Sequence, residues 1–165
     1  IGLCILMVFV GLDLGLEGTV LSMMKEAGLR LLVFPLACIV GTLIGAALCG
    51  LLFKLSLPES LAIGAGFGWY SLAPGIIMEA GYLTASAISF LHNVMREVFS
   101  ILLLPLIAAK VGCIEAACVP GAPAMDVCLP IINRATQGRG VTYGFVTGVT
   151  MSFLVPIMVP IMINL

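Results

Sequence analysis

Residues 83–109 constrain this chain most, because they are apolar along their length and yet carry ionisable residues near the middle. A helix needs about 20 residues to cross a bilayer, so the segment is long enough to span one. At about 100° per residue, Asn93 and Glu97 share one face of such a helix, and His92 and Arg96 lie beside it. A charge at the bilayer centre costs roughly 2.5–3.5 kcal/mol on insertion scales. We therefore expect this helix to line a transport site, the alternative being a polar seam that only joins helices.

The composition supports a membrane location. The chain is 62% hydrophobic and only 9% charged, whereas soluble domains hold about 25% charged residues. The predicted fold class is an all-α integral membrane protein, a polytopic helix bundle. The net charge of −1 and the lack of a basic cluster give no sign of a nucleic-acid partner. Six irregularly spaced cysteines and one histidine predict neither a metal site nor a cofactor.

The apolar segments form one predicted transmembrane domain, residues 1–165. Four segments are expected to be continuous spans: 1–15, 29–53, 83–109 and 141–164. Two segments contain glycines and prolines that break helices, and are expected to be broken or re-entrant: 60–78 and 116–133. Backbone without helical hydrogen bonds survives at membrane depth only inside protein or beside a wet cavity. Such breaks are therefore typical of a binding site.

The distribution of basic residues predicts an orientation. If all six segments cross, one group of loops holds four basic residues: Lys25, Arg30, Arg134 and Arg139. The alternate loops hold Lys54 and Lys110. The excess favours a cytoplasmic location for the first group and a C-terminus outside, although re-entrant segments would change the count.

Several residues of the broken segments are candidates for the site. The expected break positions are Gly66, Gly68, Pro74, Gly75, Gly121 and Pro123. A helix that restarts after Pro123 would hold Asp126 in its first turn, either as a capping acid or as a carboxylate at a site. Trp69 and Tyr70 can offer ring faces to a cation, the alternative being an interfacial aromatic pair.

Four stretches together resemble the LysO family of bacterial lysine exporters. They are Gly66-Phe-Gly-Trp-Tyr-Ser-Leu72, then Glu79, then Asn93-Val-Met-Arg-Glu97, and Gly121-Ala-Pro-Ala-Met-Asp-Val-Cys-Leu-Pro130. The resemblance continues to Ser152-Phe-Leu-Val-Pro156 and covers essentially the whole chain in matching order. The family more often reads G-A-T-S-M-D at 121–126, so two hydroxyl groups are absent here. It also tends to have Ser-Gly where Ala-Pro-Gly follows Leu72.

The resemblance implies export of L-lysine and of toxic analogues such as thialysine, with Glu97 as an essential intramembrane acid. It also implies that this chain matches the C-terminal part of such an exporter. We therefore expect a prokaryotic inner-membrane, multi-pass location, exchange with protons or sodium ions, and either an N-terminal half-subunit or a homo-oligomer. The candidate substrate or ion ligands are Glu97, Asn93, Asp126, Arg96, Ser71, Tyr70, Trp69 and Glu79.

The motif residues can serve different roles. Glu97 can pair with a lysine ammonium, whereas Arg96 can instead tie a broken segment in place. Free N–H groups at a helix start near Pro74-Gly75 or Pro123 can meet the α-carboxylate. His92 can carry a coupling proton, but a satisfied histidine on a polar seam is the favoured interpretation.

Three other functions compete with a lysine exporter. One is an ion-coupled carrier of another organic solute, including an organic anion. Another is an intramembrane enzyme that uses His92 with Ser89 or Cys128, although no hydrolase or zinc-protease motif supports it. The third is a subunit that packs against a transporter without transporting.

Overall fold

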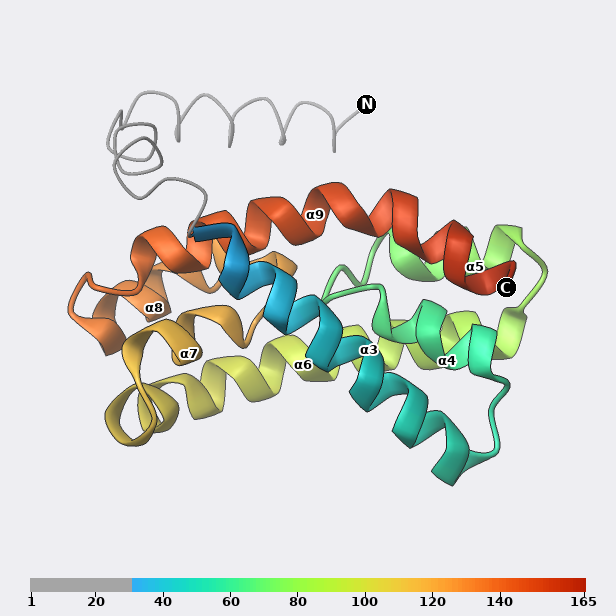
Figure 1. Ribbon diagram of the computed structural model, residues 1–165, viewed down its shortest axis with the longest axis horizontal. Helices are drawn as coiled ribbons and strands as arrows, with labels where there is room; N and C mark the ends of the chain where they lie inside the picture. Colours follow the sequence, from blue (N-terminus) through green and yellow to red (C-terminus); the bar gives the residue numbers. More distant parts are fainter. Residues whose placement is uncertain (1–30) are drawn as a thin grey trace.

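The computed structural model describes residues 31–165. Within this range every regular element is a helix, which confirms the all-α fold class. Three helices are long and apolar enough to cross a membrane: α3 (Val33–Phe53), α6 (Leu83–Lys110) and α9 (Val141–Ile163). The segment 1–15, Lys25 and Arg30 lie outside the described residues. Figure 1 shows α6 and α9 running lengthwise, with α3 crossing them obliquely.

The first broken segment is a re-entrant hairpin, which we call hairpin 1. Its arms are α4 (Leu57–Gly64) and α5 (Ala73–Glu79), joined by irregular backbone over 65–72. A capping box starts α4: the Ser56 N–H donates to Glu59 Oε2 at 3.1 Å, and the Glu59 N–H donates to Ser56 Oγ at 3.4 Å. Both arms lie at the same end of the molecule, so the chain turns back midway (Figure 1).

The second broken segment is a hairpin that enters from the opposite end, and we call it hairpin 2. Its arms are α7 (Cys113–Cys118) and α8 (Leu129–Thr136), with the 3₁₀-helix η2 (Ala122–Met125) at its tip. The tips of both hairpins meet between α6 and α9 (Figure 1). The sequence predicted the interruptions, and the structure adds that neither segment crosses from end to end.

The two hairpins follow the same plan at a constant spacing. Their first arms begin at Leu57 and Cys113, and their second arms begin at Ala73 and Leu129, a shift of 56 residues in both cases. Each second arm carries a proline in its first turn, where the missing N–H costs no helical bond. A long helix follows each hairpin, and the two long helices run in opposite directions (Figure 1). The described part therefore contains an inverted repeat of hairpin and helix.

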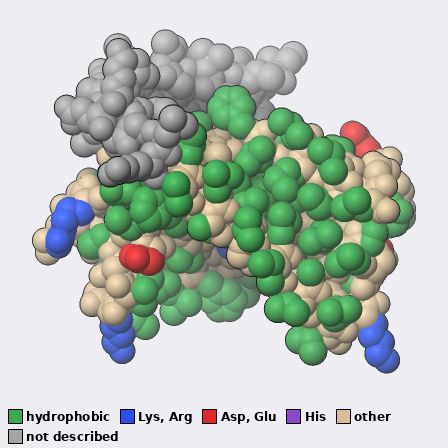
Figure 2. All heavy atoms as spheres, viewed as in Figure 1, with side chains coloured by type: hydrophobic (Ala, Val, Ile, Leu, Met, Phe, Trp, Pro, Cys, Tyr) green, Lys and Arg blue, Asp and Glu red, His purple; other side chains and the backbone are tan. Residues whose placement is uncertain are grey.

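The core lies around the hairpins. One buried cluster includes Phe67 and Ile77 of hairpin 1 and Met151 and Val155 of α9. A second cluster packs Leu104 of α6 against hairpin 2. The outer faces of α3 and α6 expose large apolar side chains, and Figure 2 shows hydrophobic side chains spread over the face of the molecule that is in view. A surface of this kind suits contact with lipid.

Candidate functional site

A direct backbone contact joins the two hairpin tips. The N–H of Ala122 donates to the carbonyl oxygen of Phe67 at 2.9 Å. Gly68 and Gly121, one on each tip, adopt positive φ angles of +97° and +79°, which glycine accepts without steric cost. A Cβ atom at Gly68 would lie 2.8 Å from Cδ of Pro123 on the opposite tip. Glycine therefore allows the tips to touch.

A pocket of about 370 Å³ lies between the tips and the two long helices. This volume is within the range of about 300–1,000 Å³ that is usual for small-molecule sites. The lining comes from hairpin 1, α6, hairpin 2 and α9: Gly68, Trp69, Tyr70, Ser71, Glu97, Ala122, Pro123, Met125, Asp126, Val127 and Ser152. The inverted repeat is visible in this set, because residues 69–71 and 125–127 are related by the same 56-residue shift.

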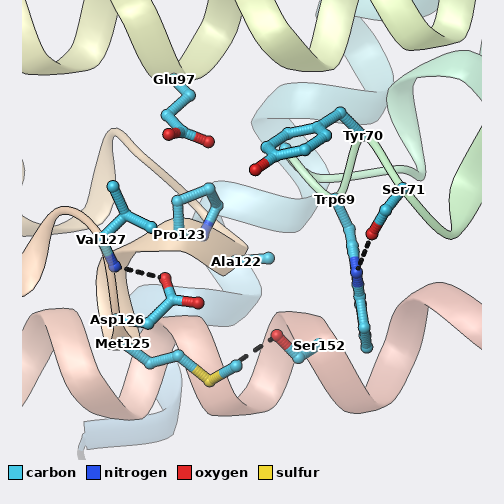
Figure 3. Close-up of a pocket in the computed structure, with 11 residues that line it drawn as sticks. Trp69, Tyr70, Ser71, Glu97, Ala122, Pro123, Met125, Asp126, Val127 and Ser152 are labelled. Carbon is cyan, nitrogen blue, oxygen red and sulfur yellow. Dashed lines mark hydrogen bonds between the residues drawn. The ribbon is translucent and has the colours of Figure 1, made fainter. Parts of the chain in front are cut away.

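Two carboxylates face the pocket from opposite sides. Glu97 projects from α6 and Asp126 from hairpin 2 (Figure 3). Oδ1 of Asp126 accepts the Val127 N–H at 2.6 Å, whereas Oε2 of Glu97 is buried and has no hydrogen-bond partner. A buried acceptor without a partner is costly. Because no Lys, Arg or His is among the lining residues, the arrangement favours a cationic ligand.

Neutral polar groups complete the lining. The Tyr70 ring extends from hairpin 1 with its hydroxyl toward the side of the pocket where Glu97 lies, as Figure 3 shows. The Trp69 indole N–H donates to Ser71 Oγ at 2.9 Å, so these two side chains hold each other at the tip of hairpin 1. On the α9 side, the Ser152 hydroxyl lies 3.8 Å from the sulfur of Met125. The pocket can thus surround an ammonium group with carboxylate, hydroxyl and aromatic partners.

Asn93 and Arg96 contact the hairpins instead of lining the pocket. Oδ1 of Asn93 accepts the N–H of Gly68 at 2.8 Å. The guanidinium of Arg96 donates through Nε to the carbonyl oxygen of Val119 at 3.2 Å. Their side chains therefore face backbone of hairpins 1 and 2, although both were expected among the ligands.

The structure places several of the predicted residues outside the pocket lining. Glu79 is exposed at the end of α5 and does not line the pocket. Pro74 and Gly75 lie in the first turn of α5 and not in the break, because a proline is compatible with that turn. Gly66 lies in the break, under the Asn93 amide.

The start of the helix after Pro123 is also different from the prediction. Pro123 lies inside η2, and α8 begins only at Leu129, so Asp126 precedes the helix and is not in its first turn.

His92 faces a separate cavity of about 390 Å³ between α3, α4 and α6. Sequence reasoning gave no site role to Met125 or Ser152, and the only signal for Ser152 was its place in the closing motif at 152–156.

Within residues 31–165, no group of three or more His, Cys, Asp or Glu side chains is placed to bind a metal ion. The described part of the chain combines the helices of a membrane protein with an acidic pocket between two re-entrant hairpins. These features define a transporter-like class of membrane protein.

Comparison with known proteins identifies the family. The family model described as "Lysine exporter LysO" matches residues 1–163, and the chain belongs to this family. Lysine exporter LysO of Escherichia coli K12 is 30% identical over 158 residues, which cover 95% of this chain and 52% of that protein. A putative lysine exporter of Haemophilus influenzae is 32% identical over 151 residues, which cover 86% of this chain and 74% of that protein.

The chain thus spans about half of the length of the Escherichia coli relative. No solved structure matches it. The family match confirms the resemblance of the motifs, and it assigns the chain to a family of transporters and not of enzymes.

Proposed function

We propose that this chain binds L-lysine, and analogues such as thialysine, in the pocket between the hairpin tips and takes part in its export. The observation that carries the proposal is the buried, unpartnered Oε2 of Glu97 in a pocket that holds a second carboxylate and no cationic lining residue. A lysine ammonium would supply the missing donor as a charge-assisted hydrogen bond. The family match and the names of both relatives support lysine as the substrate.

The second carboxylate allows two cations to compete. Asp126 faces the same pocket, so an incoming proton or sodium ion can neutralise one acid while a lysine ammonium leaves the other. Exchange of this kind needs no cofactor. An organic anion is a poor alternative substrate, since the two carboxylates of the lining would repel it and no lining residue is basic.

The inverted repeat supports alternating access. Hairpin 1 enters from one end and hairpin 2 from the other (Figure 1), and inverted repeats of this kind allow a central site to open to either side. Because both segments re-enter, Lys110, Arg134 and Arg139 belong to one end and Lys54 to the other. The positive-inside rule then favours hairpin 2 on the cytoplasmic side and the C-terminus outside.

The proposed transporter is an assembly of this chain with a second part. The chain would act in the inner membrane of a prokaryote, with an N-terminal half-subunit or with a second copy, since it spans about half of the Escherichia coli relative. In this proposal, lysine flux is a property of the assembled transporter and not of one half alone.

The test is radiolabelled lysine flux in proteoliposomes, with and without a candidate N-terminal half. Wild type is compared with Glu97→Gln and with Glu79→Gln, a matched control at an exposed acid outside the pocket. We expect Glu97→Gln to abolish flux and Glu79→Gln to preserve it. Normal lysine flux through the Glu97→Gln variant would refute the proposed site. Absence of lysine flux through wild type, with every ion gradient and with or without the partner, would refute lysine as the substrate.

A further inference from the structure

We propose that Asn93 and Arg96 are positioning residues, which fix the two hairpin tips against α6 on either side of Glu97 and do not themselves bind the substrate. The inference rests on the proposed function for the identity of the ligand, but its structural part concerns only the contacts within this chain. It gives the Asn93-Val-Met-Arg-Glu97 motif three separate tasks on one helical turn. Asn93 holds hairpin 1, Arg96 holds hairpin 2, and Glu97 faces the pocket between them.

The hydrogen-bonding capacity of Asn93 is directed at protein groups. Its side chain is fully buried. Its amide nitrogen donates to the carbonyl oxygen and the hydroxyl of Ser89, at 2.8 and 3.2 Å, and this orients the amide oxygen toward the Gly68 N–H. A Cβ atom at Gly66 would lie 2.5 Å from that nitrogen, so the backbone of the tip lies directly on the amide. Both the nitrogen and the oxygen of the Asn93 amide are therefore engaged within the protein.

Arg96 is committed to hairpin 2 in a similar way. Besides the bond to Val119, its Nη1 and Nη2 lie 3.5 Å from Thr42 Oγ1 and 3.8 Å from Cys38 Sγ on α3. A Cβ atom at Gly121 would lie 3.1 Å from its Cζ and Nη2 atoms. The planar guanidinium thus packs between α3 and the glycine of the tip. Only arginine offers several fixed donors in this geometry, and lysine would supply a single flexible ammonium.

These contacts determine how the pocket is assembled. The Ala122–Phe67 hydrogen bond joins the tips to each other, and Asn93 and Arg96 join both tips to α6. Glu97 follows Arg96 directly and lies one turn after Asn93. The positions of Tyr70 and Asp126 relative to the Glu97 carboxylate therefore depend on these two side chains.

The competing role for Arg96 is direct capture of the lysine α-carboxylate. The two roles predict different responses to a ligand that lacks this carboxylate. Replacement of a positioning residue changes the affinity for lysine and for 1,5-diaminopentane by the same factor, because both ligands use the same acids. Replacement of a residue that binds the carboxylate directly changes the affinity for lysine alone.

The first measurement needs no ligand. Trp69 is the one tryptophan in the sequence and lies at the tip of hairpin 1, so its emission reports on the position of that tip. We compare wild type with Asn93→Ala, Arg96→Lys and Ser100→Ala in the purified chain. Ser100 is a matched control, because its buried hydroxyl donates only to the carbonyl oxygen of Arg96 within α6.

We expect the Asn93→Ala and Arg96→Lys emission maxima to move to longer wavelength, as the tip loosens and water reaches the indole, with no change for Ser100→Ala. An unchanged spectrum in both tip variants would overturn the proposal. Arg96→Lys retains the charge, so it tests the contact even if Asn93→Ala folds poorly.

The second measurement is equilibrium binding of labelled lysine and labelled 1,5-diaminopentane to the same variants. We expect Arg96→Lys to weaken both by about tenfold, which corresponds to about 1.4 kcal/mol. Loss of lysine binding with unchanged diamine binding would overturn the proposal in favour of carboxylate capture. If wild type binds neither ligand, the proposed function fails, whereas the Trp69 emission still decides whether the two residues hold the tips.

Discussion

Replacement of Gly68 by alanine should destabilise the protein strongly, whereas the same change at Gly75 should not. Gly68 has φ +97°, and a Cβ atom there would lie 2.8 Å from Pro123 Cδ and 3.0 Å from the carbonyl oxygen of Pro120. Backbone strain of this kind costs about 1–3 kcal/mol, and overpacking costs about 1–3 kcal/mol more. The expected loss in free energy of unfolding is therefore about 4 kcal/mol, because both neighbours belong to the opposite hairpin and can move only if the tips separate.

Gly75 provides the matched comparison within the same hairpin. It lies inside α5, and a Cβ atom there would meet nothing within 4 Å. Alanine should stabilise this position by about 0.5–1 kcal/mol, because it loses less backbone entropy than glycine in a helix. Thermal unfolding in detergent, followed by circular dichroism, should show a melting temperature about 8–16 °C lower for Gly68→Ala. A Gly68→Ala melting temperature equal to wild type, or an equal fall for Gly75→Ala, would refute the steric account of the tip contact.

Two further predictions concern the pocket and the topology. Asp126→Asn should weaken lysine binding by about tenfold, because the ligand loses one charged partner. Glu115→Gln, on α7 and outside the pocket lining, should leave lysine binding unchanged. Equal losses of affinity in the two variants would point to a general charge effect. Cysteines placed at Lys110 and Arg139 should react with a membrane-impermeant thiol reagent from the same side of the membrane, because hairpin 2 re-enters. Labelling from opposite sides would show that the segment crosses.

The sequence was sufficient for the class of the fold and for naming several candidate residues of the pocket. Within residues 31–165, length and hydropathy predicted the three helices that are long and apolar enough to cross a membrane, because the bilayer imposes both requirements on any helix that crosses it. Helix-breaking residues located the two interruptions. The cost of a charge in an apolar segment singled out Glu97, and the pocket lining in the structure includes it together with Trp69, Tyr70, Ser71 and Asp126.

Long-range contacts decided the rest. Periodicity placed Asn93 and Glu97 on one face of α6. It could not predict that Asn93 would contact the backbone of hairpin 1 and that Glu97 would face the pocket. Glu79 was a candidate because it lies close to a motif in the sequence. In the structure it lies outside the pocket, because of the direction in which α5 runs.

Local sequence thus determined which segments enter the membrane and where they break, because these properties depend on solvation and on backbone hydrogen bonding within a few residues. Only the tertiary structure decided that both broken segments turn back, that their tips meet, and which polar side chains face the resulting pocket. Those features depend on the packing of hairpins 56 residues apart between α6 and α9, and no local pattern encodes a contact over that distance.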